Sequence, residues 1–130
     1  LARESGTKLE LDDIKNQSFL PKSSLGAASV TDFMETLKKE ANHFKVLQKN
    51  ASKNNCRLKY VAEFNSGKAN VGLKEVDFNH PFYNLDGKDN IVLFYTERYK
   101  EQPLIIKGAG AGADVTASGL FADIIRIGNN

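Results

Sequence analysis

The sequence predicts an α+β domain, in which an antiparallel or mixed sheet is covered by helices on one face. Apolar residues recur at helical spacing between residues 30 and 50, and they alternate with polar residues between residues 56 and 76. With 130 residues, 41% of them hydrophobic and 26% charged, the chain has the size and balance of one compact globular domain.

The first segment carries few regular signals. The chain opens at Leu1 without an initiator Met, and Gly6 suits the left-handed position just past a helix. We therefore interpret the start as the last turns of a helix in an excised or proteolysed piece; a short disordered start is the alternative. A short extended stretch is expected near Ile14–Phe19, and a small-residue loop over Lys22–Ala28.

A helical region follows. Ser29 stands three residues before Asp32, a pattern that resembles a capping box. One or two amphipathic helices are expected to run to about Asn50, with a break over Ser52–Asn55. The apolar positions that define them are Val30, Phe33, Met34, Leu37, Ala41, Phe44 and Leu47.

Period-two alternation then predicts strands. Residues 56–76 read as an antiparallel hairpin around a turn at Asn65–Gly67. Residues 79–88 form a loop with a turn at Asp86-Gly87. A third strand is expected over Ile91–Tyr99, because this segment is rich in β-branched and aromatic residues.

The strongest local pattern lies near the end: a short strand at Leu104–Ile106, a glycine-rich loop at Gly108–Gly112, and a helix over Asp114–Ile127. Such a loop lets backbone N–H groups approach an anionic group at a helix N-terminus. The spacing is G-x-G-x-G, however, and not the G-x-G-x-x-G of dinucleotide sites. Two interpretations stay open: a tight turn with close backbone packing, and contact with a ligand.

Other chemistry-bearing residues are few. His43 is expected at a surface or boundary position, and His80, before Pro81, in an exposed loop where a catalytic base is the less favoured alternative. Cys56 is expected to be a buried, inert thiol on the apolar strand face and not a nucleophile. No spacing of Cys and His predicts a metal site.

Charge and hydropathy bear on partners. The net charge of +2 is too small to attract a polyanion. No apolar run approaches the length of a membrane span. A single cysteine fits a reducing, cytoplasmic compartment. Tyr95 and Tyr99 are explained by sheet packing. A solvated helix face, in preference to a nucleic-acid footprint, accounts for Lys38, Lys39, Lys45, Lys49 and Lys53.

The run from Pro103 to Ile124 closely resembles the C-terminal end of homoserine dehydrogenases. His80-Pro81-Phe82, with the segments 85–87 and 89–90, is similar to what precedes it in that family. Residues 1–6 and 9–14 resemble the form fused behind an aspartate kinase.

The resemblance implies an enzyme that interconverts L-aspartate 4-semialdehyde and L-homoserine with NAD or NADP, in threonine and methionine biosynthesis. It implies that residues 1–130 are the C-terminal part of the substrate and dimerisation domain, with 108–127 belonging to the nucleotide domain. In the family the catalytic Asp and Lys and a monovalent-cation site lie upstream. We therefore expect no catalytic or metal-binding residue here and an inactive isolated chain; the alternative is a stand-alone dimerisation or interaction module.

One role carries over by residue. The family's loop touches the cofactor through a glycine that matches Gly112, with Gly110 and Ala111 as its neighbours. The last helix, Val115–Ile127, would pack on the missing Rossmann domain. The resemblance also implies a homodimer formed through the sheet, without nucleic acid or membrane; the preference between NAD and NADP is left open.

Overall fold

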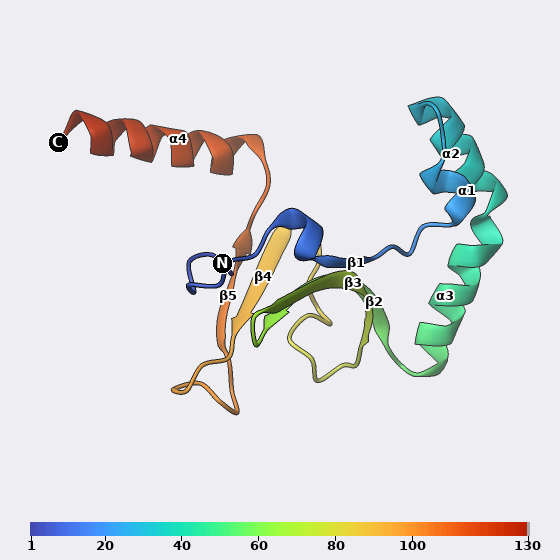
Figure 1. The fold of residues 1–130 in the computed structure, drawn as a ribbon, viewed down its shortest axis with the longest axis horizontal. Coiled ribbons are helices and arrows are strands. Elements are labelled where there is room, and N and C mark those ends of the chain that lie inside the picture. The colour runs from blue at the N-terminus through green and yellow to red at the C-terminus, as the bar shows by residue number, and fades with distance from the viewer. Residues whose placement is uncertain (130) are drawn as a thin grey trace. The chain divides into compact units, whose positions relative to one another are not determined.

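A computed structural model describes residues 1–129 of the chain. The chain separates into two compact units, Leu1–Tyr83 and Asn84–Asn130, each of which combines strands with helical segments. The predicted α+β class is confirmed. The strands form two separate sheets, however, one in each unit, where the sequence suggested one. Figure 1 shows the elements of both units.

The first unit begins with hydrogen-bonded turns. The N–H of Ser5 donates to the carbonyl oxygen of Leu1 at 3.0 Å, and Gly6 has the expected left-handed backbone, with φ of +84°. A 3₁₀ turn (η1, Leu11–Asp13) leads into β1 (Lys15–Gln17), which lies inside the expected extended stretch.

The loop predicted over residues 22–28 is wrong in its first half. Residues Lys22–Leu25 form a short helix, α1, directly after Pro21. The carbonyl oxygen of Pro21 accepts the N–H groups of both Ser24 and Leu25, so this turn closes on itself. Small residues therefore do not exclude a helix here, where Pro21 occupies the cap position before the first turn.

The helical region consists of α2 (Val30–Lys39) and α3 (Ala41–Lys53), separated at Glu40. Ser29 caps α2, because its hydroxyl accepts the N–H of Asp32 at 3.1 Å. The carboxylate of Asp32 accepts the N–H of Ala28 and not that of Ser29, so the capping box is displaced by one residue. The helix α3 continues past the expected end near residue 50.

The hairpin predicted over 56–76 is confirmed. Strand β2 (Arg57–Asn65) pairs antiparallel with β3 (Lys68–Val76), and β1 adds a parallel strand to the other edge of β3. Ser66 and Gly67 form the two-residue turn with φ of 50° and 76°. Both angles are positive, as a type I′ turn requires, because this turn matches the twist of the two strands.

One face of this sheet is mainly apolar, and the other combines charged residues with the buried Val61 and Val76. The register places Tyr60 opposite Leu73, and the hydroxyl of Tyr60 donates to Asn16 across the sheet at 3.0 Å. On the other face Lys74 pairs with Glu63 at 2.9 Å. The residues that share the apolar face are Leu58, Tyr60, Ala62, Phe64, Ala69, Val71 and Leu73.

The core of the chain is small. Among the described residues, the buried apolar side chains are those of Ala51, Val61 and Val76. Helix α3 supplies the first and contacts β2, and Figure 1 draws the three helices of this unit together at one end of the sheet. Most large apolar side chains, Tyr60 among them, stay partly or fully exposed, so much apolar surface has no cover.

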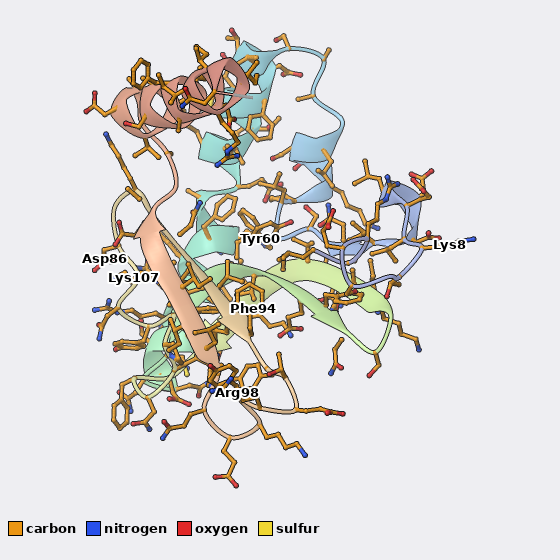
Figure 2. The ribbon with its side chains drawn as sticks, turned by 90° about the vertical axis from the view of Figure 1, so that its left-hand side faces the viewer. Lys8, Tyr60, Asp86, Phe94, Arg98 and Lys107 are labelled. Carbon is orange, nitrogen blue, oxygen red and sulfur yellow. The ribbon has the colours of Figure 1, made fainter. Side chains whose placement is uncertain are left out.

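The second unit is an antiparallel pair, β4 (Asp89–Phe94) with β5 (Leu104–Ala109), followed by α4 (Ala113–Gly128). The third strand ends at Phe94 and not at Tyr99, because Thr96 and Tyr99 exchange backbone hydrogen bonds at 3.1 and 3.4 Å and form a turn. Figure 2 marks Phe94 on β4, Lys107 on β5 and Arg98 in this turn region. None of the helices within residues 1–129 is both long and apolar enough to cross a membrane.

Candidate functional site

The glycine-rich loop is shorter than the sequence predicts. Gly108 and Ala109 belong to β5, where they pair with Asn90 and Asp89 of β4. The loop itself is Gly110-Ala111-Gly112, which joins β5 directly to α4. The structure thus brings the three predicted cofactor-contact residues together as one uninterrupted connection between a strand and a helix.

Gly112 occupies a backbone conformation that only glycine adopts readily. Its φ is 131° and its ψ is 154°, and it is the residue that caps the start of α4. The N–H and the hydroxyl of Thr116 both donate to the carbonyl oxygen of Gly112, at 3.1 and 3.0 Å. The conformation of Gly112 therefore sets the direction in which the loop enters the helix.

Glycine is required at position 110 for a different reason, because there is no room for a side chain. A Cβ on Gly110 would stand 3.1 Å from the Cβ of Asn90 and would overlap the side-chain amide of that residue. The N–H of Gly110 donates to the carbonyl oxygen of Lys88 at 3.1 Å. Gly110 therefore packs closely against β4, whereas Gly112 is open on the side where a Cβ would point.

Charges of both signs lie around the loop. The ammonium of Lys88 would be 3.9 Å from a Cβ on Gly112, and Asp114 lies in the first turn of α4. Lys107 pairs with Asp89 at 3.4 Å. Ala111 is exposed and Gly112 half-buried, and they lead into the start of a 16-residue helix, where backbone N–H groups lack intrahelical partners.

Helix α4 exposes its apolar side chains. Every residue from Ala113 to Gly128 is exposed, including Phe121 at 64% and Ile124 at 65%. An isolated helix of this length is marginal in water, since tertiary packing supplies most helical stability. The apolar positions of α4 thus form a surface that a further element is needed to cover.

The histidines make local contacts. His43 is half-buried, as expected for a boundary residue, and its Nε2 lies 2.9 Å from the carbonyl oxygen of Phe19. His80 is half-buried and not exposed, a correction of the expectation. Its Nδ1 accepts the N–H of Phe82 at 3.1 Å, and its ring lies 4.7 Å from that of Phe82. Local turn geometry accounts for His80.

Cys56 and the two tyrosines also depart from expectation. Cys56 is half-buried, lies just before β2 and not on it, and directs its sulfur to the carbonyl oxygen of Asn54 at 3.4 Å. Tyr95 and Tyr99 both lie beyond the end of β4, so they are not strand residues. The five lysines of α2 and α3 are all exposed, which fits the predicted solvated helix face.

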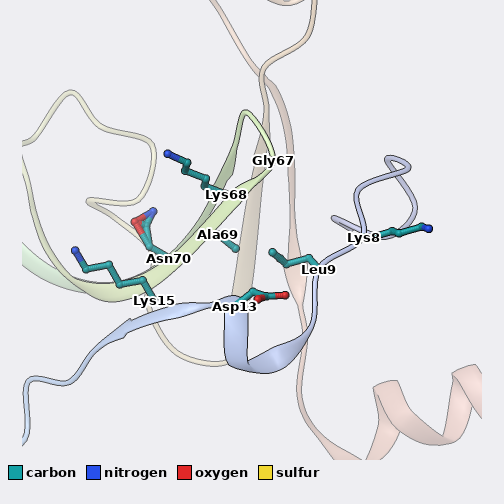
Figure 3. A pocket seen from close by; sticks show the side chains of 8 residues that line it. All are labelled: Lys8, Leu9, Asp13, Lys15, Gly67, Lys68, Ala69 and Asn70. Atoms are coloured by element: carbon teal, nitrogen blue, oxygen red, sulfur yellow. The ribbon is translucent and has the colours of Figure 1, made fainter.

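An open depression lies beside the hairpin turn of the first unit. Figure 3 shows its lining, in which the side chain of Lys8 points away from those of Lys15 and Lys68. The positive charges therefore do not converge on one point. Within residues 1–129, no three His, Cys, Asp or Glu side chains are grouped so that they could hold a metal ion.

Sequence reasoning identified the loop but missed Asn90 and Lys88 as its neighbours. The pairing of two segments, residues 89–94 and 104–109, is what places them there. The signal was available in principle, because two apolar runs joined by a turn predict a hairpin.

Comparison with known proteins gives a consistent result. A family described as homoserine dehydrogenase matches residues 1–125. The chain is 44% identical over 129 residues to the chloroplastic bifunctional aspartokinase/homoserine dehydrogenase 1 of Arabidopsis thaliana, covering 98% of the chain and 14% of that protein. It is 35% identical over 130 residues to the homoserine dehydrogenase of Saccharomyces cerevisiae, covering 98% of the chain and 36% of that protein.

A solved structure agrees in fold. A Candida auris protein of unknown function superposes with a TM-score of 0.84 at 40% identity, covering 99% of this chain and 37% of that one. The chain therefore spans little more than a third of these relatives at most.

Proposed function

Because the chain belongs to the homoserine dehydrogenase family, we propose that it is the C-terminal part of the substrate and dimerisation domain of such an enzyme. The complete protein would interconvert L-aspartate 4-semialdehyde and L-homoserine, a step of threonine and methionine biosynthesis. The observation that carries the proposal is a match along nearly the whole chain to both bifunctional and single-function relatives.

The role of this chain in catalysis is to contact the cofactor and to complete the fold around it. NAD or NADP would supply the hydride acceptor or donor. The accessible backbone at Ala111 and Gly112, at the start of α4, fits a group that approaches the main chain closely. Gly112 leaves open the space that a side chain would take, while Gly110 holds the loop to β4.

The isolated chain is proposed to be inactive. The hydrogen bonds of His80 are those of a local turn, and the sulfur of Cys56 is directed to the carbonyl oxygen of Asn54. The catalytic Asp and Lys, as in the family, would come from a segment upstream. The parent is proposed to be a cytoplasmic enzyme fused to aspartokinase.

Helix α4 would dock on the nucleotide-binding domain. Its exposed apolar residues include Leu120, Phe121 and Ile124. Burial of side chains of this size stabilises a contact by about 1.5–3 kcal/mol each. This docking would also explain why a 16-residue helix follows the glycine loop without packing on its own unit.

The apolar face of the first sheet would join two copies of the chain. Tyr60 is 52% exposed and Phe64 is 39% exposed on that face. Strands with one apolar face need a second layer. A substitution Ala62→Arg in the middle of the face should shift the complete protein from dimer to monomer in sedimentation, whereas Lys74→Arg on the opposite face should not.

A second candidate function is a stand-alone dimerisation or interaction module, favoured by the same uncovered apolar surfaces. An assay of the complete protein, which is the product of the whole reading frame that encodes this chain, distinguishes the two functions. Homoserine-dependent reduction of NADP, followed by absorbance, supports the enzyme. A folded complete protein that self-associates but turns over neither homoserine nor aspartate semialdehyde would support the module instead.

A further inference from the structure

The side chain of Asn90 fills the space beside Gly110. Both the amide nitrogen and the Cγ of Asn90 would overlap a Cβ at position 110, and the Cβ of Asn90 would stand 3.1 Å from it. Asn90 is exposed, and its backbone pairs with Gly108, two residues before Gly110. The amide therefore covers one face of the loop at the point where the chain leaves the sheet.

A second contact holds the same point of the loop. The N–H of Gly110 donates to the carbonyl oxygen of Lys88, two residues before Asn90. A hydrogen bond on one side and a packed amide on another fix the peptide plane at Gly110. Two residues later, Gly112 caps α4 in a conformation that only glycine adopts readily. A backbone rotation at Gly110 would thus change the orientation of the Gly112 backbone.

We infer that Asn90 is a positioning residue for the cofactor, acting through Gly110 to hold the Gly112 backbone in place. This inference rests on the proposed function. Asn90 need not touch the dinucleotide itself. Its contribution is to prevent the loop from relaxing toward β4, because a displacement of about 1 Å at a binding group is enough to cost much of its effect.

The space that Asn90 fills gives a sharp test. In Asn90→Ala the loop loses its cover, and in Gly110→Ala the new methyl collides with the amide. In the double variant Asn90→Ala/Gly110→Ala, the methyl at position 110 no longer meets the amide, and only the Cβ of residue 90, at 3.1 Å, has to shift by a few tenths of an ångström. The two changes should therefore be strongly non-additive, as expected for groups in direct contact.

The experiment measures NADPH affinity of the complete protein by fluorescence titration, together with kcat, KM and the unfolding temperature. Each single change should weaken NADPH binding about tenfold, with KM for homoserine nearly unchanged, and the double variant should return to within about threefold of wild type. Gly108→Ala is the matched control, because a Cβ there meets nothing within 4 Å.

An unchanged NADPH affinity in Asn90→Ala would overturn the inference, as would a loss confined to unfolding temperature, or additive effects in the double variant. These outcomes leave the dehydrogenase assignment intact. A folded wild-type protein that binds no dinucleotide would instead contradict the proposed function, and the inference with it.

Discussion

The guanidinium of Arg57 lies 4.4 Å from the centre of the Tyr83 ring, and its Nη1 donates to the carbonyl oxygen of Tyr83 at 3.1 Å. Arg57 begins β2, and Tyr83 lies in the loop that follows β3. One side chain thus ties that loop, which contains the His80-Pro81-Phe82 segment, to the edge of the sheet.

Arg57→Ala should loosen this loop locally. Loss of a hydrogen bond and an exposed cation–π contact costs about 1–2 kcal/mol, so amide exchange over residues 77–83 should accelerate roughly fivefold or more. Arg57→Lys should give an intermediate rate, because an ammonium cannot make both contacts in the same geometry. Arg98→Ala is the control, since Arg98 lies 5.7 Å from the Tyr99 ring in the other unit. Equal rates in Arg57→Ala and wild type would contradict the role given to Arg57.

Ser24→Ala should stabilise the first unit. Ser24 is 2% exposed, and its hydroxyl has no hydrogen-bond partner within residues 1–129. Removal of an unpaired buried hydroxyl is worth about 1 kcal/mol, and alanine is also the better helix former. Its neighbour Ser23 donates to Glu40 at 2.9 Å, so Ser23→Ala should have the opposite sign. Amide exchange of α1 and α2 measures both; faster exchange in Ser24→Ala would show that its hydroxyl has a partner.

The hairpin turn should respond to residues that favour positive φ. Ser66→Asn should slow amide exchange across β2 and β3 about twofold to fivefold, because Asn tolerates the left-handed region better than Ser. Gly67→Ala should accelerate it, since φ at this position is 76°. Gly26→Ala is the control, with φ of −93° and open space around it. A stabilising Gly67→Ala would contradict the type I′ turn.

Gly112→Ala should weaken NADPH binding by the complete protein. The backbone conformation is the cause, since a Cβ at this position meets only the ammonium of Lys88, at 3.9 Å. Strain of this kind costs about 1–3 kcal/mol, or roughly fivefold to a hundredfold in affinity. Gly108→Ala, which adds a Cβ in open space on β5, should leave affinity unchanged. Fluorescence titration of both variants is the measurement. An NADPH affinity of Gly112→Ala equal to that of wild type would show that Gly112 is not part of the cofactor site.

The parts of the fold that depend on local pattern could be predicted. Alternation fixed the β2–β3 hairpin, and Ser29 marked the start of α2. The ends of the strands and their pairing could not be predicted, because they depend on residues elsewhere in the chain. Tyr95 looks like a strand residue, yet the turn made by Thr96 and Tyr99 ends the strand before it. Gly108 looks like a loop residue, yet β4 pairs with it.

The same limit applies to the candidate site. The glycines of the loop are visible in the sequence, and the family resemblance gave Gly112 its expected role. Asn90 carries no signal of its own, because an asparagine at the start of a strand has many ordinary explanations. Only the register that sets it against Gly108 brings its amide to Gly110.

The most direct test of the central claim compares two purified proteins in one assay, the complete protein and this 130-residue chain alone. Homoserine and NADP are supplied, and NADPH formation is followed by absorbance. The account predicts turnover by the complete protein and none by the isolated chain. Turnover by the isolated chain, or its absence from a folded complete protein, would contradict the account.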